Sequence, residues 1–170
     1  FPYYQKRFHA SYSEISWIFS ALVISRLITQ VPAGYLADMY SKRNMMLWGL
    51  LFFGPATFCL GLGRSTFDLV LLRLIQGVTA TMVMTPAMAL GANLAPPKAK
   101  GRAMGILGMS FTLGVTLGPV LAGFLLSIHP LLPFLLALIL AYLSGVFIYL
   151  KIPEKEVLHP TFLETSKPEI

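Results

Sequence analysis

Five long apolar segments with very few charges constrain the fold of this chain more than any other feature. They cover residues 15–37, 44–63, 67–94, 103–127 and 131–150, and their only charged side chains are Arg26, Asp68 and Arg73. A helix needs about 20 apolar residues to cross a hydrocarbon core of roughly 30 Å, and each segment is long enough. The sequence therefore predicts an all-α membrane fold with five transmembrane helices.

The last two of these segments lie in one stretch without Lys, Arg, Asp or Glu, residues 103–150. This stretch is too long for a single span. His129-Pro130, followed by Pro133, predicts the break between two helices. The other connections are also short, so we expect helices that are neighbours in sequence to pack antiparallel. Residues 1–14 are expected outside the membrane, 15–152 form the bundle, and 153–170 form a cytoplasmic linker or a truncated central loop.

Composition excludes several classes of protein. Charged residues make up 12% of the chain, about half of what is usual for a soluble domain, which argues against a soluble enzyme or binding domain. The net charge of +6 does not form a basic stripe with interleaved aromatics, so no nucleic acid partner is expected. Cys59 is the single cysteine, and the three histidines are scattered. We therefore expect no enzyme activity, no metal site and no cofactor.

The distribution of Lys and Arg predicts the orientation in the membrane. Eight of these residues fall on one side of the expected spans and three on the other, while Arg26 and Arg73 lie within spans. Because cytoplasmic loops are enriched in Lys and Arg, we expect the N-terminus outside and the C-terminus in the cytoplasm. An odd number of spans with an external N-terminus is what remains if one preceding helix has been lost.

Arg26 lies in the middle of its span, where a lipid-facing position costs roughly 2.5–3.5 kcal/mol. Thr29 and Gln30 fall on the same helical face, together with two alanines, at positions 33 and 37. One interpretation is an arginine on a water-filled path, able to meet an anionic group. The other is a structural ion pair with a carboxylate on a helix that this chain does not contain.

Arg73 lies a short way inside the outer end of its helix, from where its side chain could reach the membrane surface. A face of small and flexible residues continues beneath it, however, with Gln76 to one side. This face contains Gly77, Ala80, Met84, Ala87 and Gly91. Such a pattern favours a helix that lines a cavity over one that only packs tightly against a neighbour.

Two further regions carry a recognisable pattern. Asp38 ends the first span, where the helix dipole disfavours an acid, so it needs a positive partner such as Lys42 or Arg43, unless it is a plain surface-loop residue.

The fourth span is rich in small residues on two faces, so we expect helices to approach it closely. These residues are Gly105, Gly114, Gly118, Ala122 and Gly123, with Pro119 expected to bend the helix.

Taken together, three spaced motifs resemble those of the major facilitator superfamily. Residues 34–43 (GYLADMYSKR) are similar to the loop signature between the second and third helices of that family, except at Met39 and Ser41. Residues 69–77 (LVLLRLIQG) are similar to its fourth-helix signature, whose arginine is implicated in proton coupling. The spacing of Gly105, Gly114, Gly118-Pro119 and Gly123 resembles the fifth-helix signature of drug:proton antiporters, with Ala122 in place of a glycine.

The resemblance implies helices two to six of a twelve-helix transporter, most of one six-helix half, in the plasma (inner) membrane. It implies that Arg73, Gln76 and Gly77 serve proton coupling, and Arg26 with Gln30 is expected on the substrate or ion path. Gly34, Asp38, Lys42 and Arg43 are expected to form a cytoplasmic gate. The implied partners are the lipid bilayer, a small-molecule substrate, protons, and a first helix and C-terminal half of the same transporter.

Three functions follow as hypotheses. The first is proton-driven export of small drug-like or amphipathic molecules by alternating access. The second is proton-coupled import of an organic anion or other small solute, which the central position of Arg26 motivates. The third belongs to another class, a membrane fragment that does not transport and serves only as an assembly partner.

Overall fold

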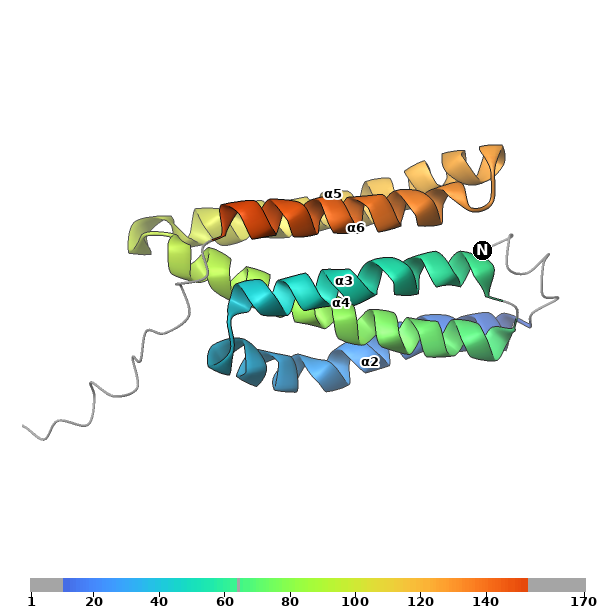
Figure 1. The fold of residues 1–170 in the computed structure, drawn as a ribbon, viewed down its shortest axis with the longest axis horizontal. Helices are drawn as coiled ribbons and strands as arrows, with labels where there is room; N and C mark the ends of the chain where they lie inside the picture. The colour runs from blue at the N-terminus through green and yellow to red at the C-terminus, as the bar shows by residue number, and fades with distance from the viewer. Residues whose placement is uncertain (1–10, 64, 153–170) are drawn as a thin grey trace, which may run out of the picture.

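The computed structural model describes residues 11–63 and 65–152, and all of their regular structure is helical. Five long helices and one short 3₁₀ turn follow one another along the chain (Figure 1). They are α2 (Tyr12–Met39), α3 (Lys42–Leu62), α4 (Thr66–Leu94), η1 (Pro97–Ala99), α5 (Lys100–Ile128) and α6 (Leu132–Lys151). The prediction of an all-α fold with five long apolar helices is confirmed. The predicted tail 153–170 and most of the predicted external segment 1–14 lie outside the described residues.

Local side-chain chemistry explains where the helices begin. Ser65 and Asp68 form a reciprocal pair at the start of α4, in which the Ser65 amide donates to Asp68 Oδ2 (3.1 Å) and the Asp68 amide donates to Ser65 Oγ (3.2 Å). At the start of α2, the Ser11 amide donates to Glu14 Oε2 (2.8 Å). These bonds satisfy backbone donors that the first turn of a helix leaves without partners.

The helices are long and apolar enough to cross a membrane, and each continues past any proline within it. Pro32, Pro55, Pro86 and Pro119 lie inside α2, α3, α4 and α5. By length and composition, all five qualify as membrane spans. Proline is tolerated in such helices because neighbouring groups can satisfy the freed backbone carbonyl.

Helix α4 holds the bundle together. It packs against α2 on one side and α3 on the other, α3 packs in turn against α6, and α5 makes smaller contacts with α4 and α6 (Figure 1). The expectation that sequence neighbours pack together is wrong for α2 and α3, which make few contacts. A short connection makes two helices antiparallel, but the complementarity of their side chains decides which helices pack closely.

Two glycines let α4 lie close to the backbone of its neighbours. A Cβ atom added to Gly49 in α3 would lie 2.7 Å from Val83 Cγ2 and 3.0 Å from the Thr79 carbonyl oxygen. A Cβ atom added to Gly77 in α4 would lie 2.8 Å from the Leu22 carbonyl oxygen. Small residues let helix backbones approach closely in membranes, and the α3–α4 and α2–α4 contacts depend on them.

Most of the remaining helix surface is apolar and exposed. Val31 is 81% exposed and Leu27 is 72% exposed, both on α2, and α5 contains no buried residue. Water would not tolerate such a surface over five helices, whereas hydrocarbon would. The burial pattern agrees with a bundle surrounded by lipid.

Candidate functional site

The two arginines that the sequence places within spans line one cavity. Its volume is about 310 Å³, and residues from α2, α3, α4 and α5 surround it. The lining residues are Leu22, Arg26, Leu50, Phe53, Arg73, Gln76, Ala80, Val83, Met84 and Phe111. The two arginines are the only charged residues in this set, so the cavity combines two cations with an otherwise largely apolar wall.

A hydrogen-bonded chain positions Arg73. Its Nη1 donates to Gln76 Oε1 (2.8 Å), and Gln76 Nε2 donates to Thr57 Oγ1 (2.8 Å) on α3. Thr57 Oγ1 donates in turn to the Phe53 carbonyl oxygen (2.8 Å). Gln76 is buried, and a buried amide that satisfies both its donor and its acceptor restrains its neighbours. The guanidinium is therefore linked to α3 as well as to its own helix.

An aromatic ring supports the same guanidinium from α2. Arg73 Cζ lies 5.5 Å from the centroid of the Phe19 ring. A guanidinium within about 6 Å of an aromatic face is attracted by the ring quadrupole, and the attraction is stronger away from water. Arg73 thus contacts α2 directly and is linked to α3 through Gln76. The alternative considered from the sequence, in which the side chain only reaches the membrane surface, does not describe this arrangement.

Thr57 and Phe19 are contributors that sequence reasoning missed. Each lies in an apolar segment whose periodicity does not distinguish one face from another. A threonine whose hydroxyl bonds the carbonyl four residues earlier is common in helices and gives no signal by itself. Only the packing of α3 and α2 against α4 shows that Phe19 lies beside Arg73 and that Thr57 holds its partner Gln76.

Gly77 has a packing position in the structure rather than a position on the cavity wall. It is buried, and a Cβ atom there would lie 2.8 Å from both the Leu22 carbonyl oxygen and Ser25 Cβ. Next to it, Ser25 Oγ donates to the Leu74 carbonyl oxygen (2.6 Å). The α2–α4 contact that Gly77 permits brings Arg26 and Arg73 to the same cavity.

The two residues of α2 that are predicted to lie on the substrate or ion path, Arg26 and Gln30, have different surroundings in the structure. Arg26 is half-buried and lines the cavity, whereas Gln30 is exposed and does not. Thr29 turns toward α4, where its hydroxyl lies 3.3 Å from Thr81 Oγ1 and also donates to the Ser25 carbonyl oxygen (2.7 Å). The polar face expected around Arg26 is therefore divided between the cavity, the helix contact and the bundle exterior.

Of the predicted gate residues, Gly34 and Asp38 lie in the last turns of α2, and Lys42 and Arg43 begin α3. Arg43 Nη2 donates to the Tyr149 carbonyl oxygen (2.8 Å), and its Cζ lies 4.6 Å from the centroid of the Tyr149 ring. Apart from its own helix backbone, no atom of the described residues lies within 4 Å of a Cβ added to Gly34. In this structure Arg43 connects the start of α3 to the end of α6.

The glycines of the antiporter-type motif are exposed on α5. No atom of the described residues lies within 4 Å of a Cβ added to Gly105, Gly114, Gly118 or Gly123. Pro119 is exposed as well, and the helix continues through it. The expected close approach of other helices to this surface does not occur among the described residues, and the role of the motif stays a prediction.

Comparison with known proteins shows which family this sequence belongs to. The sequence profile of the Major Facilitator Superfamily matches residues 1–169. Multidrug resistance protein 1 of Bacillus subtilis is 28% identical over 155 residues, which cover 91% of this chain and 40% of that protein. Multidrug resistance protein 2 of the same organism is 30% identical over 145 residues, covering 85% of this chain and 36% of that protein.

A third relative comes from another organism. Quinolone resistance protein NorA of Staphylococcus aureus is 29% identical over 145 residues, covering 85% of this chain and 37% of that protein. The chain thus spans about two-fifths of the length of these curated relatives. The family match agrees with the five apolar helices and confirms the resemblance of the three sequence motifs. The chain is an integral membrane protein and belongs to the Major Facilitator Superfamily.

Proposed function

We propose that this chain forms part of a transporter that exports small drug-like or amphipathic molecules in exchange for protons. The observation that carries the proposal is the cavity that Arg26 and Arg73 line together with residues from four helices. Relatives named for multidrug and quinolone resistance support the substrate class. Transporters of this architecture bind substrate near the membrane midplane and alternate access by rocking one bundle against another.

Arg73 is proposed as the residue that couples transport to protons. A fixed guanidinium favours the ionised form of a carboxylate placed near it, and movement away from that carboxylate favours protonation. The link to Gln76 and Thr57 holds the guanidinium in place, so its distance from a carboxylate changes only when helices move. Gly77 contributes by permitting the close α2–α4 contact, as a positioning residue.

The proposal includes partners beyond this chain, since the chain covers about two-fifths of its relatives. A first helix and a C-terminal half of the same transporter would complete the cavity and supply the carboxylate. The charge distribution supports a plasma (inner) membrane protein with its Lys42 and Lys151 ends in the cytoplasm. At that surface, Asp38, Lys42 and Arg43 are proposed to hold the outward-open state, with Gly34 giving α2 room near the turn.

The test is transport in energised inverted vesicles that contain the complete transporter. Efflux of a fluorescent amphipathic cation and substrate-driven proton movement are measured on the same vesicles. Arg73→Ala is expected to abolish substrate-driven proton movement, and Arg73→Lys to restore only part of it because ammonium lacks the planar fork that meets Gln76. Lys98→Ala, an exposed change in η1, is the matched control. Unchanged proton coupling in Arg73→Ala would refute the proposed role.

Import of an organic anion is the second candidate. Two arginines line the cavity, and none of its lining residues is acidic, which favours an anionic ligand. Uptake of a labelled organic anion into energised right-side-out vesicles, in which uptake corresponds to import into the cell, distinguishes the two directions. Uptake that Arg26→Ala abolishes supports import, whereas its absence beside active cation efflux supports export.

A further inference from the structure

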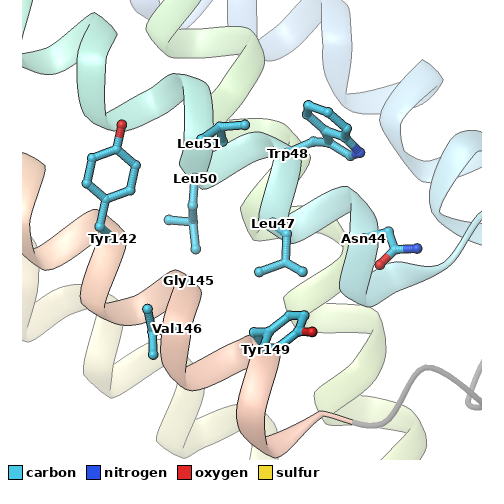
Figure 2. Close-up of a pocket in the computed structure, with 9 residues that line it drawn as sticks. All are labelled: Asn44, Leu47, Trp48, Leu50, Leu51, Tyr142, Gly145, Val146 and Tyr149. Atoms are coloured by element: carbon cyan, nitrogen blue, oxygen red, sulfur yellow. The ribbon is translucent and has the colours of Figure 1, made fainter.

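A second cavity lies between α3 and α6, on the outside of the bundle (Figure 2). Its volume is about 640 Å³. Leu47 and Leu50 of α3 point toward Val146 and Tyr149 of α6 across it (Figure 2). Trp48 and Leu51 also line it, and Trp48, Leu51, Val146 and Tyr149 are each between 45% and 62% exposed. Gly145 keeps it open, because the nearest atom to a Cβ added there is Leu50 Cδ1 at 3.9 Å. We call this cavity the α3–α6 groove.

The shape and chemistry of the α3–α6 groove suit a hydrocarbon chain. From Asn44 to Leu51 the helix rises about 10 Å, which is most of the roughly 15 Å thickness of one leaflet's hydrocarbon. The walls are almost entirely apolar, and the amide of Asn44 lies at the end nearest the helix termini (Figure 2). An apolar groove of this length that begins at the membrane surface can hold an acyl chain lengthwise.

The open end of the α3–α6 groove is basic. Lys42 and Arg43 form the first turn of α3, and Lys151 ends α6. The bond from Arg43 to the Tyr149 carbonyl oxygen shows that these two helix ends meet. The first turn of α3 contains no acidic residue, although the N-terminus of a helix already carries partial positive charge. An anion at this position would therefore complement both the side chains and the helix dipole.

We propose that the α3–α6 groove binds an anionic phospholipid of the leaflet at this end of the bundle. One acyl chain lies along Leu51, Val146 and Gly145, and the phosphate faces Lys42 and Lys151. The basic groove mouth favours an anionic over a zwitterionic headgroup, and the groove holds the chain that the headgroup brings with it. The α3–α6 groove is a separate cavity from the one that the arginines line, although Leu50 lines both, and the inference does not depend on the direction of transport.

Trp48 supplies a direct reporter of this site. The chain contains two tryptophans, Trp17 and Trp48, so Trp17→Phe leaves the groove residue as the only one. The full chain is reconstituted in phosphatidylcholine vesicles with a small fraction of brominated-chain phosphatidylglycerol, or with the same fraction of brominated-chain phosphatidylcholine. We expect the anionic lipid to quench Trp48 fluorescence at a much lower mole fraction than the zwitterionic lipid.

Charge variants in the Trp17→Phe background test the headgroup contact. Lys42→Gln and Lys151→Gln should each reduce the preference for phosphatidylglycerol about fivefold, since a basic residue near the surface attracts anionic lipid by that amount. Lys98→Gln is the matched control, because Lys98 is exposed in η1 and does not line the groove. Equal quenching by the two lipids, or a preference that survives both substitutions together, would overturn the proposal.

A variant that fills the α3–α6 groove tests whether an acyl chain binds there. Gly145→Leu places a side chain in the groove and should remove the preferential quenching, whereas Gly101→Leu, which adds the same side chain in open space on α5, should keep it. Thermal unfolding in detergent shows whether Gly145→Leu is folded, and the charge variants decide the matter if it is not. Preferential quenching that persists in folded Gly145→Leu would contradict acyl-chain binding in the groove.

Discussion

Arg73 and Gln76, one helical turn apart on α4, are joined by a hydrogen bond of 2.8 Å from the guanidinium Nη1 to the amide Oε1. Nε2 of the same amide donates to Thr57 on α3, so the Arg73 guanidinium is linked to a neighbouring helix. Movement of α3 relative to α4 must break or shift this connection. A charge held in this way can respond to a change in helix packing.

Thr57→Val tests this connection through stability. Valine has a similar shape but removes the acceptor for Gln76 Nε2, which would leave a buried donor without its partner, at a cost of roughly 1–3 kcal/mol. A lower midpoint of thermal unfolding in detergent is expected. Thr112→Val is the matched control, because the exposed Thr112 hydroxyl bonds only the Gly108 carbonyl of its own helix. Equal midpoints for the two variants would contradict the prediction.

Gly77→Ala tests the close α2–α4 contact. The added Cβ would lie 2.8 Å from the Leu22 carbonyl oxygen, and because a backbone atom cannot rotate away, α2 must shift. Overpacking of this kind costs about 1–3 kcal/mol. Gly101→Ala adds the same methyl group in open space and should leave the unfolding midpoint unchanged. If both variants were equally stable, Gly77 would not be needed for packing.

Arg43→Lys tests the connection between α3 and α6. Lysine keeps the charge but lacks the planar guanidinium that lies over the Tyr149 ring while donating to the Tyr149 carbonyl oxygen. Faster hydrogen exchange is therefore expected at the last turn of α6 and unchanged exchange in the middle of α4. Lys42→Arg is the control for a charge-conserving change on the same turn. Unaltered exchange in α6 would show that the charge alone holds the two ends together.

Thiol labelling tests the predicted orientation. Cys59 is the single cysteine, so Cys59→Ser provides a background for Ser65→Cys and Lys98→Cys at opposite ends of α4. With the positive-inside rule, a membrane-impermeant thiol reagent added to intact cells should label position 65 and not position 98. Labelling of both positions after permeabilisation is the control. The reverse pattern in intact cells would place the C-terminus of the described bundle outside.

The sequence by itself determined the class of fold and the number of long helices. Segments of 20 or more residues with few charges can satisfy their backbone groups in lipid only as helices or closed barrels, and single segments of this length and apolarity favour helices. The sequence also marked Arg26 and Arg73, because a charge within an apolar span stands out against its neighbours. Its three motifs indicated the family that the comparison then confirmed.

Only the tertiary structure decided which side chains meet. Periodicity places a residue on a face of its own helix, but it does not say which helix covers that face. Because α3 and α2 both pack on α4, Thr57 bonds Gln76 and Phe19 lies beside Arg73. Gln30 does not line the cavity that Arg26 lines. Helix pairing depends on the fit of small residues such as Gly49 and Gly77 against particular partners. That fit is a property of two surfaces together, so one segment's pattern does not contain it.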